Sequence, residues 1–217
     1  IILLNKGSSL FFMKLIGNGA EAKIYLDAKK NRVVKRRLQK SYRLDIMDKK
    51  IRVQRTRREG KILSKLSGIC PDVVGVDDKG MEIVMNYVEG PLVRDVLEEC
   101  DKGTRGKVMK LVGSNVGKMH VLDVAHGDLT TSNMILNDND VKLIDFGLGF
   151  VTKKLEDKAV DVHLLKHALE SKHYRHSDEL FEAFLKGYKT GNPDWLAVIE
   201  RLKLVEKRGR YKRRFGS

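Results

Sequence analysis

Apolar and polar positions alternate over short runs in the first part of the chain. The run from Leu15 to Leu26 sets apolar residues around two glycines, and residues 32–36 and 81–85 are also rich in β-branched and apolar residues. These runs predict strands, the first of which turns at the glycines and returns as a second strand. Between them, residues 51–66 place apolar positions among strong helix formers, so we expect one inserted helix.

The apolar spacing becomes helical after Pro91. Residues 107–122, 159–169 and 179–188 repeat apolar side chains at helical intervals, which predicts three helices. One short strand pair is expected in this part, on either side of the polar turn 137–140. The second part of the chain is therefore predicted to be mostly helical.

The change of pattern divides the chain into two predicted lobes. Residues 1–85 form the first lobe, residues 86–90 a hinge, and residues 91–217 the second lobe with a basic C-terminal tail. Residues 1–12 and Gly216–Ser217 lie outside the patterned segments, and we interpret them as a linker or as added ends.

Composition favours a folded protein of a reducing compartment. With 217 residues, of which 41% are hydrophobic, the chain is long enough for one large domain or two small lobes. Its two cysteines are too few for a disulfide framework and lack metal-ligand spacing. No apolar run approaches the roughly 20 residues of a membrane span. We therefore expect a cytoplasmic protein without a membrane partner.

The charge of the chain is strongly positive. A net charge of +14 and a pI near 9.7 suggest a polyanionic partner such as RNA. Basic residues crowd into residues 49–58 and 207–214. The first cluster is compatible with a solvated helix face as well as with a contact to a polyanion. For the second cluster we predict a docking or nucleic-acid-binding arm.

The strongest chemical signal is the stretch from His126 to Asn133, followed twelve residues later by Asp145. Asp128 can accept a hydroxyl proton, while Asn133 and Asp145 can ligate magnesium across nucleotide phosphates. His126 is expected to brace the loop. Each carboxylate alone would be an ordinary loop cap or turn residue, but their order and spacing together predict a phosphoryl-transfer centre.

A second signal lies in the predicted β-rich lobe. The turn from Gly17 to Ala22 lacks bulky side chains at its glycines, so backbone amides could approach a triphosphate there. Lys35 on the next predicted strand could pair with the phosphates if a carboxylate from the inserted helix held it, and Glu59 is the candidate. A ligand-free hairpin and a surface lysine are the alternatives for these residues taken singly.

With these residues the chain resembles a known family, the small atypical kinase of the KEOPS complex, within the protein-kinase-like superfamily. The resemblance runs from about Met13 to Arg214. It rests on the basic tail and on the strings Gly19-Ala20-Glu21-Ala22, Tyr42-Arg43, Arg55-Thr56-Arg57-Arg58-Glu59 and His126-Gly127-Asp128-Leu129-Thr130-Thr131-Ser132-Asn133.

The resemblance implies an α+β, two-lobed protein-kinase-like fold. The N-lobe would be small and β-rich with one main helix, and the C-lobe reduced and mostly helical. The expected ligands are ATP and Mg²⁺, with Asp128, Lys35 and Asn133 as catalytic residues and Asn133 and Asp145 as metal ligands. The residues expected to contact the nucleotide are Ile16, Gly17, Asn18, Gly19, Ala20, Glu21, Ala22, Ile24, Lys35, Glu59, Met85 and Tyr87.

The resemblance also implies a function inside an assembly. The family is expected to hydrolyse ATP or to phosphorylate itself as a serine/threonine kinase, in support of threonylcarbamoyladenosine synthesis on transfer RNA. The implied partners are the threonylcarbamoyltransferase subunit, a small accessory subunit on the N-lobe and transfer RNA. The transferase is fused to the kinase in some archaea, and a chain that begins with Ile1 instead of methionine is compatible with such a fusion.

Two departures from ordinary kinases narrow the expected activity. Gly127 and Thr130 stand where ordinary kinases carry arginine and lysine, and only thirteen residues separate Gly147 from Asp161. There is no room for a long activation segment that would seat a peptide. We therefore expect slow ATP turnover that is constitutive or gated by a partner.

Two other classes of function stay open from the sequence. A small-molecule kinase of the aminoglycoside phosphotransferase type shares the string from His126 to Leu129 and the later Asn133, but it usually needs a larger, acidic pocket in its second lobe. An RNA-binding scaffold without catalysis would explain the charge but not the set of Lys35, Asp128, Asn133 and Asp145.

Overall fold

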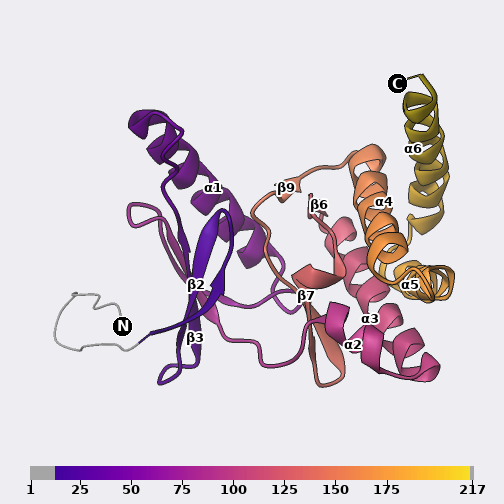
Figure 1. The fold of residues 1–217 in the computed structure, drawn as a ribbon, viewed down its shortest axis with the longest axis horizontal. Helices are drawn as coiled ribbons and strands as arrows, with labels where there is room; N and C mark the ends of the chain where they lie inside the picture. Colours follow the sequence, from indigo (N-terminus) through magenta and orange to yellow (C-terminus); the bar gives the residue numbers. More distant parts are fainter. Residues whose placement is uncertain (1–12, 216–217) are drawn as a thin grey trace. The chain divides into compact units, whose positions relative to one another are not determined.

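The computed structural model describes residues 13–215, with side chains described up to residue 208 (Figure 1). The described residues divide into two compact units. Unit 1 comprises residues 13–67 and 71–88, and unit 2 comprises residues 68–70 and 89–215. Residues 1–12 and 216–217, interpreted above as a linker or added ends, lie outside the described residues, and the predicted hinge stays a prediction.

A five-stranded antiparallel sheet forms the body of unit 1. Its strands lie in the order β1-β2-β3-β5-β4. The edge strand β4 was missed by the sequence analysis, because its half-exposed side chains and Gly75 weaken the apolar signal. The bounds are β1 Lys14–Asn18, β2 Ala22–Asp27, β3 Arg32–Arg37, β4 Val73–Asp77 and β5 Glu82–Asn86.

The inserted helix of unit 1 is α1, Asp45–Lys65. The helix begins at residue 45, whereas the prediction placed its start at residue 51. The prediction was late because the first turns break the apolar pattern: Ile46 is 86% exposed, while the charged Asp48 is fully buried. Further along, Ile62 and Leu63 are buried, and the helix packs against β4 and β5. This end of α1 is thus anchored on the sheet.

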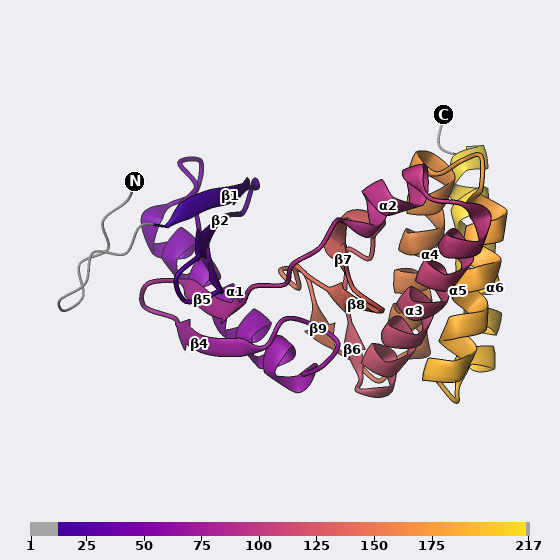
Figure 2. The same ribbon diagram turned by 90° about the horizontal axis from the view of Figure 1, so that it is seen from below.

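Unit 2 is mainly helical (Figure 2). Helix α3 packs along α5, and α4 packs along α6. Glycines line the α3–α5 contact, and a Cβ atom added at Gly117 would lie 2.8 Å from the backbone of Gly191. The two helix backbones therefore touch. The bounds are α2 Val93–Glu99, α3 Lys102–Val121, α4 Leu155–Lys172, α5 Ser177–Gly191 and α6 Trp195–Phe215.

The basic stretch at residues 207–214 continues helix α6, which the sequence analysis did not predict. Val198 and Leu202 are buried in the first half of this helix. Towards the stretch, Glu206 pairs with Lys166 of α4 at 2.7 Å, and Arg208 pairs with Glu156 at 2.6 Å. The side chains from residue 209 onward lie outside the description, so the predicted nucleic-acid arm stays a prediction.

Two small sheets and a 3-10 turn complete unit 2. The predicted strand pair around residues 137–140 is confirmed, because β7 pairs with β8 across that turn. None of the helices in residues 13–215 combines the length and apolar composition that a membrane span requires. The bounds are β6 Val124–Ala125, η1 Thr131–Asn133, β7 Met134–Asn137, β8 Asp140–Leu143 and β9 Phe150–Val151.

Candidate active site

The loop after β6 is held at its backbone by Asp161, which is buried in the middle of α4. One oxygen of this carboxylate accepts a hydrogen bond from the His126 N–H at 2.5 Å, and the other accepts one from the Gly127 N–H at 2.8 Å. His120 of α3 contacts the same carboxylate at 3.3 Å. Asp161 therefore fixes the start of the loop immediately before Asp128.

His126 connects this loop to the turn that carries Asp145. Its Nε2 lies 3.0 Å from the carbonyl oxygen of Ile144 and must donate, while Nδ1 accepts from the Asp128 N–H at 3.3 Å. Burial lowers the pKa of His126, against the opposing charge of Asp161. The ring also packs on Phe146 at 4.6 Å between centroids. A neutral imidazole with its proton on Nε2 fits all of these contacts.

Asp128 and Asn133 contact each other across the loop. The amide nitrogen of Asn133 donates to the Asp128 backbone oxygen at 2.8 Å and to its carboxylate at 3.0 Å. Asp128 is exposed. Since both contacts use the amide nitrogen, the side-chain oxygen of Asn133 is the atom that can ligate a cation. The pair therefore presents a carboxylate and a carbonyl oxygen at one place.

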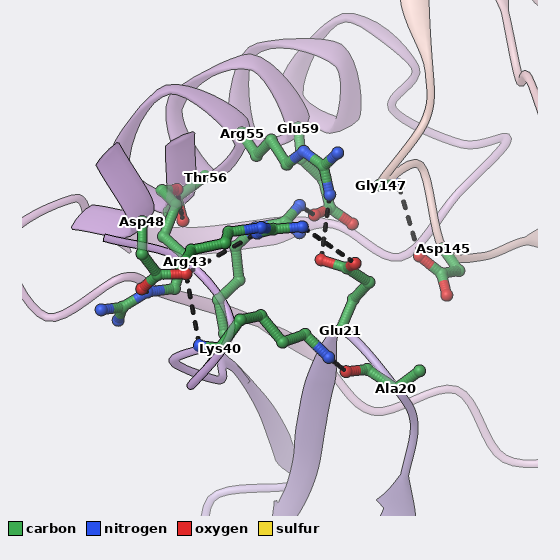
Figure 3. A network of polar contacts seen from close by, with 12 residues as sticks. Ala20, Glu21, Lys40, Arg43, Asp48, Arg55, Thr56, Glu59, Asp145 and Gly147 are labelled. Atoms are coloured by element: carbon green, nitrogen blue, oxygen red, sulfur yellow. Dashed lines mark hydrogen bonds and ion pairs between the residues drawn. The ribbon is translucent and has the colours of Figure 1, made fainter. Parts of the chain in front are cut away.

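The β7–β8 hairpin brings Asn133 next to Asp145. Met134 pairs with Leu143, and the Ile144 N–H donates to the Asn133 carbonyl at 2.9 Å. Asp145 has a φ of 62°, an uncommon left-handed conformation for a residue with a side chain. Its carboxylate accepts from the Gly147 N–H at 3.3 Å (Figure 3). Two oxygen ligands completed by phosphate oxygens and water suit Mg²⁺.

The structure gives a physical reason for glycine at position 127. Gly127 has a φ of 77°, and a Cβ atom there would lie 2.7 Å from the carbonyl oxygen of Leu148. Both the backbone conformation and the space oppose a side chain. The arginine that ordinary kinases carry at this place could not be accommodated by this loop without moving the backbone.

Replacing Gly127 with alanine is expected to lower the unfolding free energy by about 1–2 kcal/mol, the cost of a left-handed residue, before any clash with Leu148 is added. Trp195 is the single tryptophan and lies in unit 2, so urea unfolding followed by its fluorescence reports on this unit. Gly106→Ala in α3 is the matched control, since a Cβ there meets nothing within 4 Å. Equal stability of the two variants would contradict the explanation.

In unit 1, Lys35 of β3 contacts Glu59 of α1. The Lys35 Nζ lies 2.6 Å from one carboxylate oxygen, and the Arg37 guanidinium lies 2.5 Å from the other. All three side chains are buried, with relative exposures of 7% for Lys35, 1% for Glu59 and 5% for Arg37. Arg37 was not predicted from the sequence, although its place two residues after Lys35 on a strand puts it on the same face.

The predicted glycine-rich turn connects β1 and β2. The Gly19 N–H donates to the Ala22 carbonyl at 3.0 Å, which closes the turn. Ile24 lies opposite Lys35 in the β2–β3 register. The N–H of Tyr87 already donates to the Asn31 carbonyl, so a base would have to use other groups of this residue. All residues predicted to contact the nucleotide lie in unit 1, whereas Asp128, Asn133 and Asp145 lie in unit 2.

A chain of polar groups that starts in the interior and ends at the exposed Glu98 supports the middle of the loop in unit 2. Thr131 lies 3.1 Å from Nε2 of His173, and Nδ1 of His173 lies 2.5 Å from the carboxylate of Glu98. The sequence pattern did not predict this chain, because its members come from three separate elements. It fixes η1, whose last residue is Asn133.

Known proteins of similar sequence fall into one group. A protein kinase domain model matches residues 11–189. The KEOPS complex subunit Bud32 of Pyrococcus abyssi is 44% identical over 215 residues, which cover 93% of this chain and 98% of that protein.

Longer proteins are also similar. The probable bifunctional tRNA threonylcarbamoyladenosine biosynthesis protein of Methanocaldococcus jannaschii is 42% identical over 204 residues, covering 91% of this chain and 37% of that protein. The protein of the same name from Methanosarcina barkeri is 36% identical over 213 residues, covering 96% and 37%. The chain thus spans little more than a third of these bifunctional relatives.

Proposed function

Because the chain belongs to the protein kinase family and, within it, to the family of KEOPS subunits named Bud32, we propose that it supports threonylcarbamoyladenosine modification of transfer RNA by magnesium-dependent ATP hydrolysis or autophosphorylation. The observation that carries the catalytic part of this proposal is the buried ion pair between Lys35 and Glu59 at 2.6 Å. A scaffold that only binds RNA has no need of such a pair, which is costly to desolvate.

The residues of unit 1 are suited to hold phosphates. The ammonium of Lys35 carries three donors, one of which bonds to Glu59. Glu59 also holds the Arg37 guanidinium, so two buried cations lie next to each other on one face of β3. We propose that these cations, with the backbone of the glycine-rich turn, orient the phosphates of ATP.

The residues of unit 2 are suited to bind metal and to orient the acceptor. When bound, magnesium would be held by the side-chain oxygens of Asn133 and Asp145 and would neutralise phosphate charge. Asp128 would orient the attacking hydroxyl or water and accept its proton. The contacts from Asn133 keep the Asp128 carboxylate in one orientation. Thr130, in place of lysine, supplies no cation, so the intrinsic turnover is proposed to be slow.

The segment after Asp145 supports the proposal that free proteins are not the main substrates. Phe150 pairs with Ala125, and the Thr152 N–H donates to the Asp123 carbonyl at 2.8 Å. The Thr152 hydroxyl then donates to Asp157 in the first turn of α4. The chain therefore passes from the Asp145 turn into α4 through a short, bonded connection that offers no platform for a peptide.

The partners follow from the relatives. In the bifunctional relatives, the part matched by this chain is joined to further sequence in a protein named for threonylcarbamoyladenosine biosynthesis. We propose a threonylcarbamoyltransferase subunit as the main partner, together with transfer RNA and a small accessory subunit on unit 1. The aminoglycoside phosphotransferase alternative is disfavoured, because the similarity to a KEOPS subunit extends over 98% of that protein.

ATP binding by calorimetry and phosphate release with and without Mg²⁺ test the proposed function. We expect binding that depends on magnesium, slow hydrolysis by the chain alone, and faster hydrolysis with the transferase subunit and transfer RNA. A small-molecule kinase would instead respond to a small acceptor. If no nucleotide binds under any of these conditions, the enzymatic part of the proposal is lost.

A further inference from the structure

Glu21, at the end of the glycine-rich turn, is bound by two arginines from outside the sheet. The Arg55 guanidinium of α1 lies 2.9 Å from one carboxylate oxygen of Glu21, and the Arg43 guanidinium lies 3.9 Å from the other. Lys40 also donates from its ammonium to the carbonyl oxygen of Ala20 (Figure 3). Three cations from residues 40–55 thus converge on two adjacent residues of the turn.

Arg43 and the backbone of Lys40 are themselves held by Asp48, a fully buried carboxylate in the first turn of α1. Asp48 pairs with Arg52 at 2.6 Å and with Arg43 at 3.6 Å, and it accepts from the Lys40 N–H at 3.3 Å. Burial raises the pKa of Asp48, but the hydrogen bonds from Arg52 and Lys40 and the charges of Arg52 and Arg43 outweigh it and hold this pKa below its ordinary value. Arg43 is therefore placed between two carboxylates and loses less side-chain entropy on meeting Glu21 than an isolated arginine would.

Helix α1 connects this contact to Lys35. Arg55 and Glu59 are four residues apart on α1, so they lie on the same face one turn from each other. Arg55 binds the glycine-rich turn through Glu21, and Glu59 binds Lys35. One helix face therefore sets the positions of both parts of unit 1 that we propose to contact phosphates.

We propose that Glu21 is a positioning residue that fixes the glycine-rich turn for nucleotide phosphates through Arg55 and Arg43. In this chain the turn is tied at its end by charge, although its glycines would allow many conformations. The contacts also give a physical role to Arg43 and Arg55, which have none in the proposed function. The inference rests on the proposed ATP-dependent activity.

Glu21→Gln is the test, because it removes the charge and keeps the size of the side chain. We expect the KM for ATP to rise by about two- to fivefold, the range for a partly exposed ion pair, with kcat and the midpoint of unfolding unchanged. Hydrogen exchange of the amides of residues 17–22, measured without nucleotide, should accelerate by a similar factor. The charge exchange Glu21→Arg with Arg55→Glu should restore part of both values.

Arg57→Gln is the matched control. Arg57 lies on the same helix and forms a more exposed pair with Asp78 at 2.5 Å, and this pair does not touch the glycine-rich turn. An unchanged KM in Glu21→Gln, or an equal rise in Arg57→Gln, would overturn the positioning role. If the wild-type chain does not turn over ATP, the proposed function fails. Even in that case, the hydrogen-exchange rates of residues 17–22 test whether Glu21 holds the turn. Unchanged rates in Glu21→Gln would refute this role.

Discussion

Replacing Asp128 with asparagine is expected to lower kcat for ATP turnover by about 10²–10⁴-fold, the usual contribution of a general base. The substitution keeps the shape of the side chain but removes the group that would accept the proton. The exposed position of Asp128 predicts that folding will be little affected. Steady-state phosphate release, together with ATP titration calorimetry, separates a loss of catalysis from a loss of binding, and we expect the dissociation constant to stay within a few-fold of wild type.

Asp138→Asn is the control for this experiment. Asp138 is an exposed aspartate in the turn between β7 and β8 with a φ of 49°, a conformation that asparagine adopts readily. It should leave kcat unchanged. Full activity in Asp128→Asn would contradict the assigned role of Asp128 while leaving ATP binding by unit 1 intact.

Replacing Glu59 with alanine is expected to lower the unfolding free energy of unit 1 by about 3–5 kcal/mol, the cost of breaking a buried ion pair and leaving charge behind. Two buried cations, Lys35 and Arg37, would then lose the carboxylate that contacts both of them. ATP turnover should be lost as well, because Lys35 loses its support. Denaturant unfolding followed by circular dichroism, with hydrogen exchange across α1, measures the first effect without relying on Trp195 in the other unit.

Glu82→Ala provides the comparison within the same sheet. Glu82 pairs with Arg36 at 2.6 Å, but its side chain is 20% exposed, so water can replace the lost partner. A cost of at most about 1 kcal/mol is expected. If the two variants lose similar unfolding free energy, burial does not determine how much the Glu59 ion pairs contribute to stability.

Much of the fold could be predicted because it depends on local patterns. The β-rich first part and mostly helical second part, and with them the two-lobed protein-kinase-like fold, are confirmed by the protein kinase domain match. The site residues were identified from the same kind of evidence, since Asp128, Asn133 and Asp145 are close in sequence and joined by one hairpin. Their roles stay predictions that the variants above test.

The features that could not be predicted from the sequence depend on contacts between distant segments. Arg37 and Asp161 owe their positions to partners 22 and 34 or more residues away. The start of α1 was not predicted, because a buried carboxylate contacted by arginines takes the place of the apolar residues that usually indicate a helix. In α6, Val198 and Leu202 are buried, and this packing is not evident from the charged sequence that follows them.

The contact between α3 and α5 bears on how mutational scans of this chain should be interpreted. At Gly117, Gly187 and Gly191 an added methyl group would meet backbone atoms of the opposite helix. A second substitution elsewhere can shorten a side chain, but it cannot remove a main-chain carbonyl. If substitutions at these glycines are not tolerated, the cause is the short distance between the two helices. No second substitution should rescue them, and their loss carries no information about phosphoryl transfer.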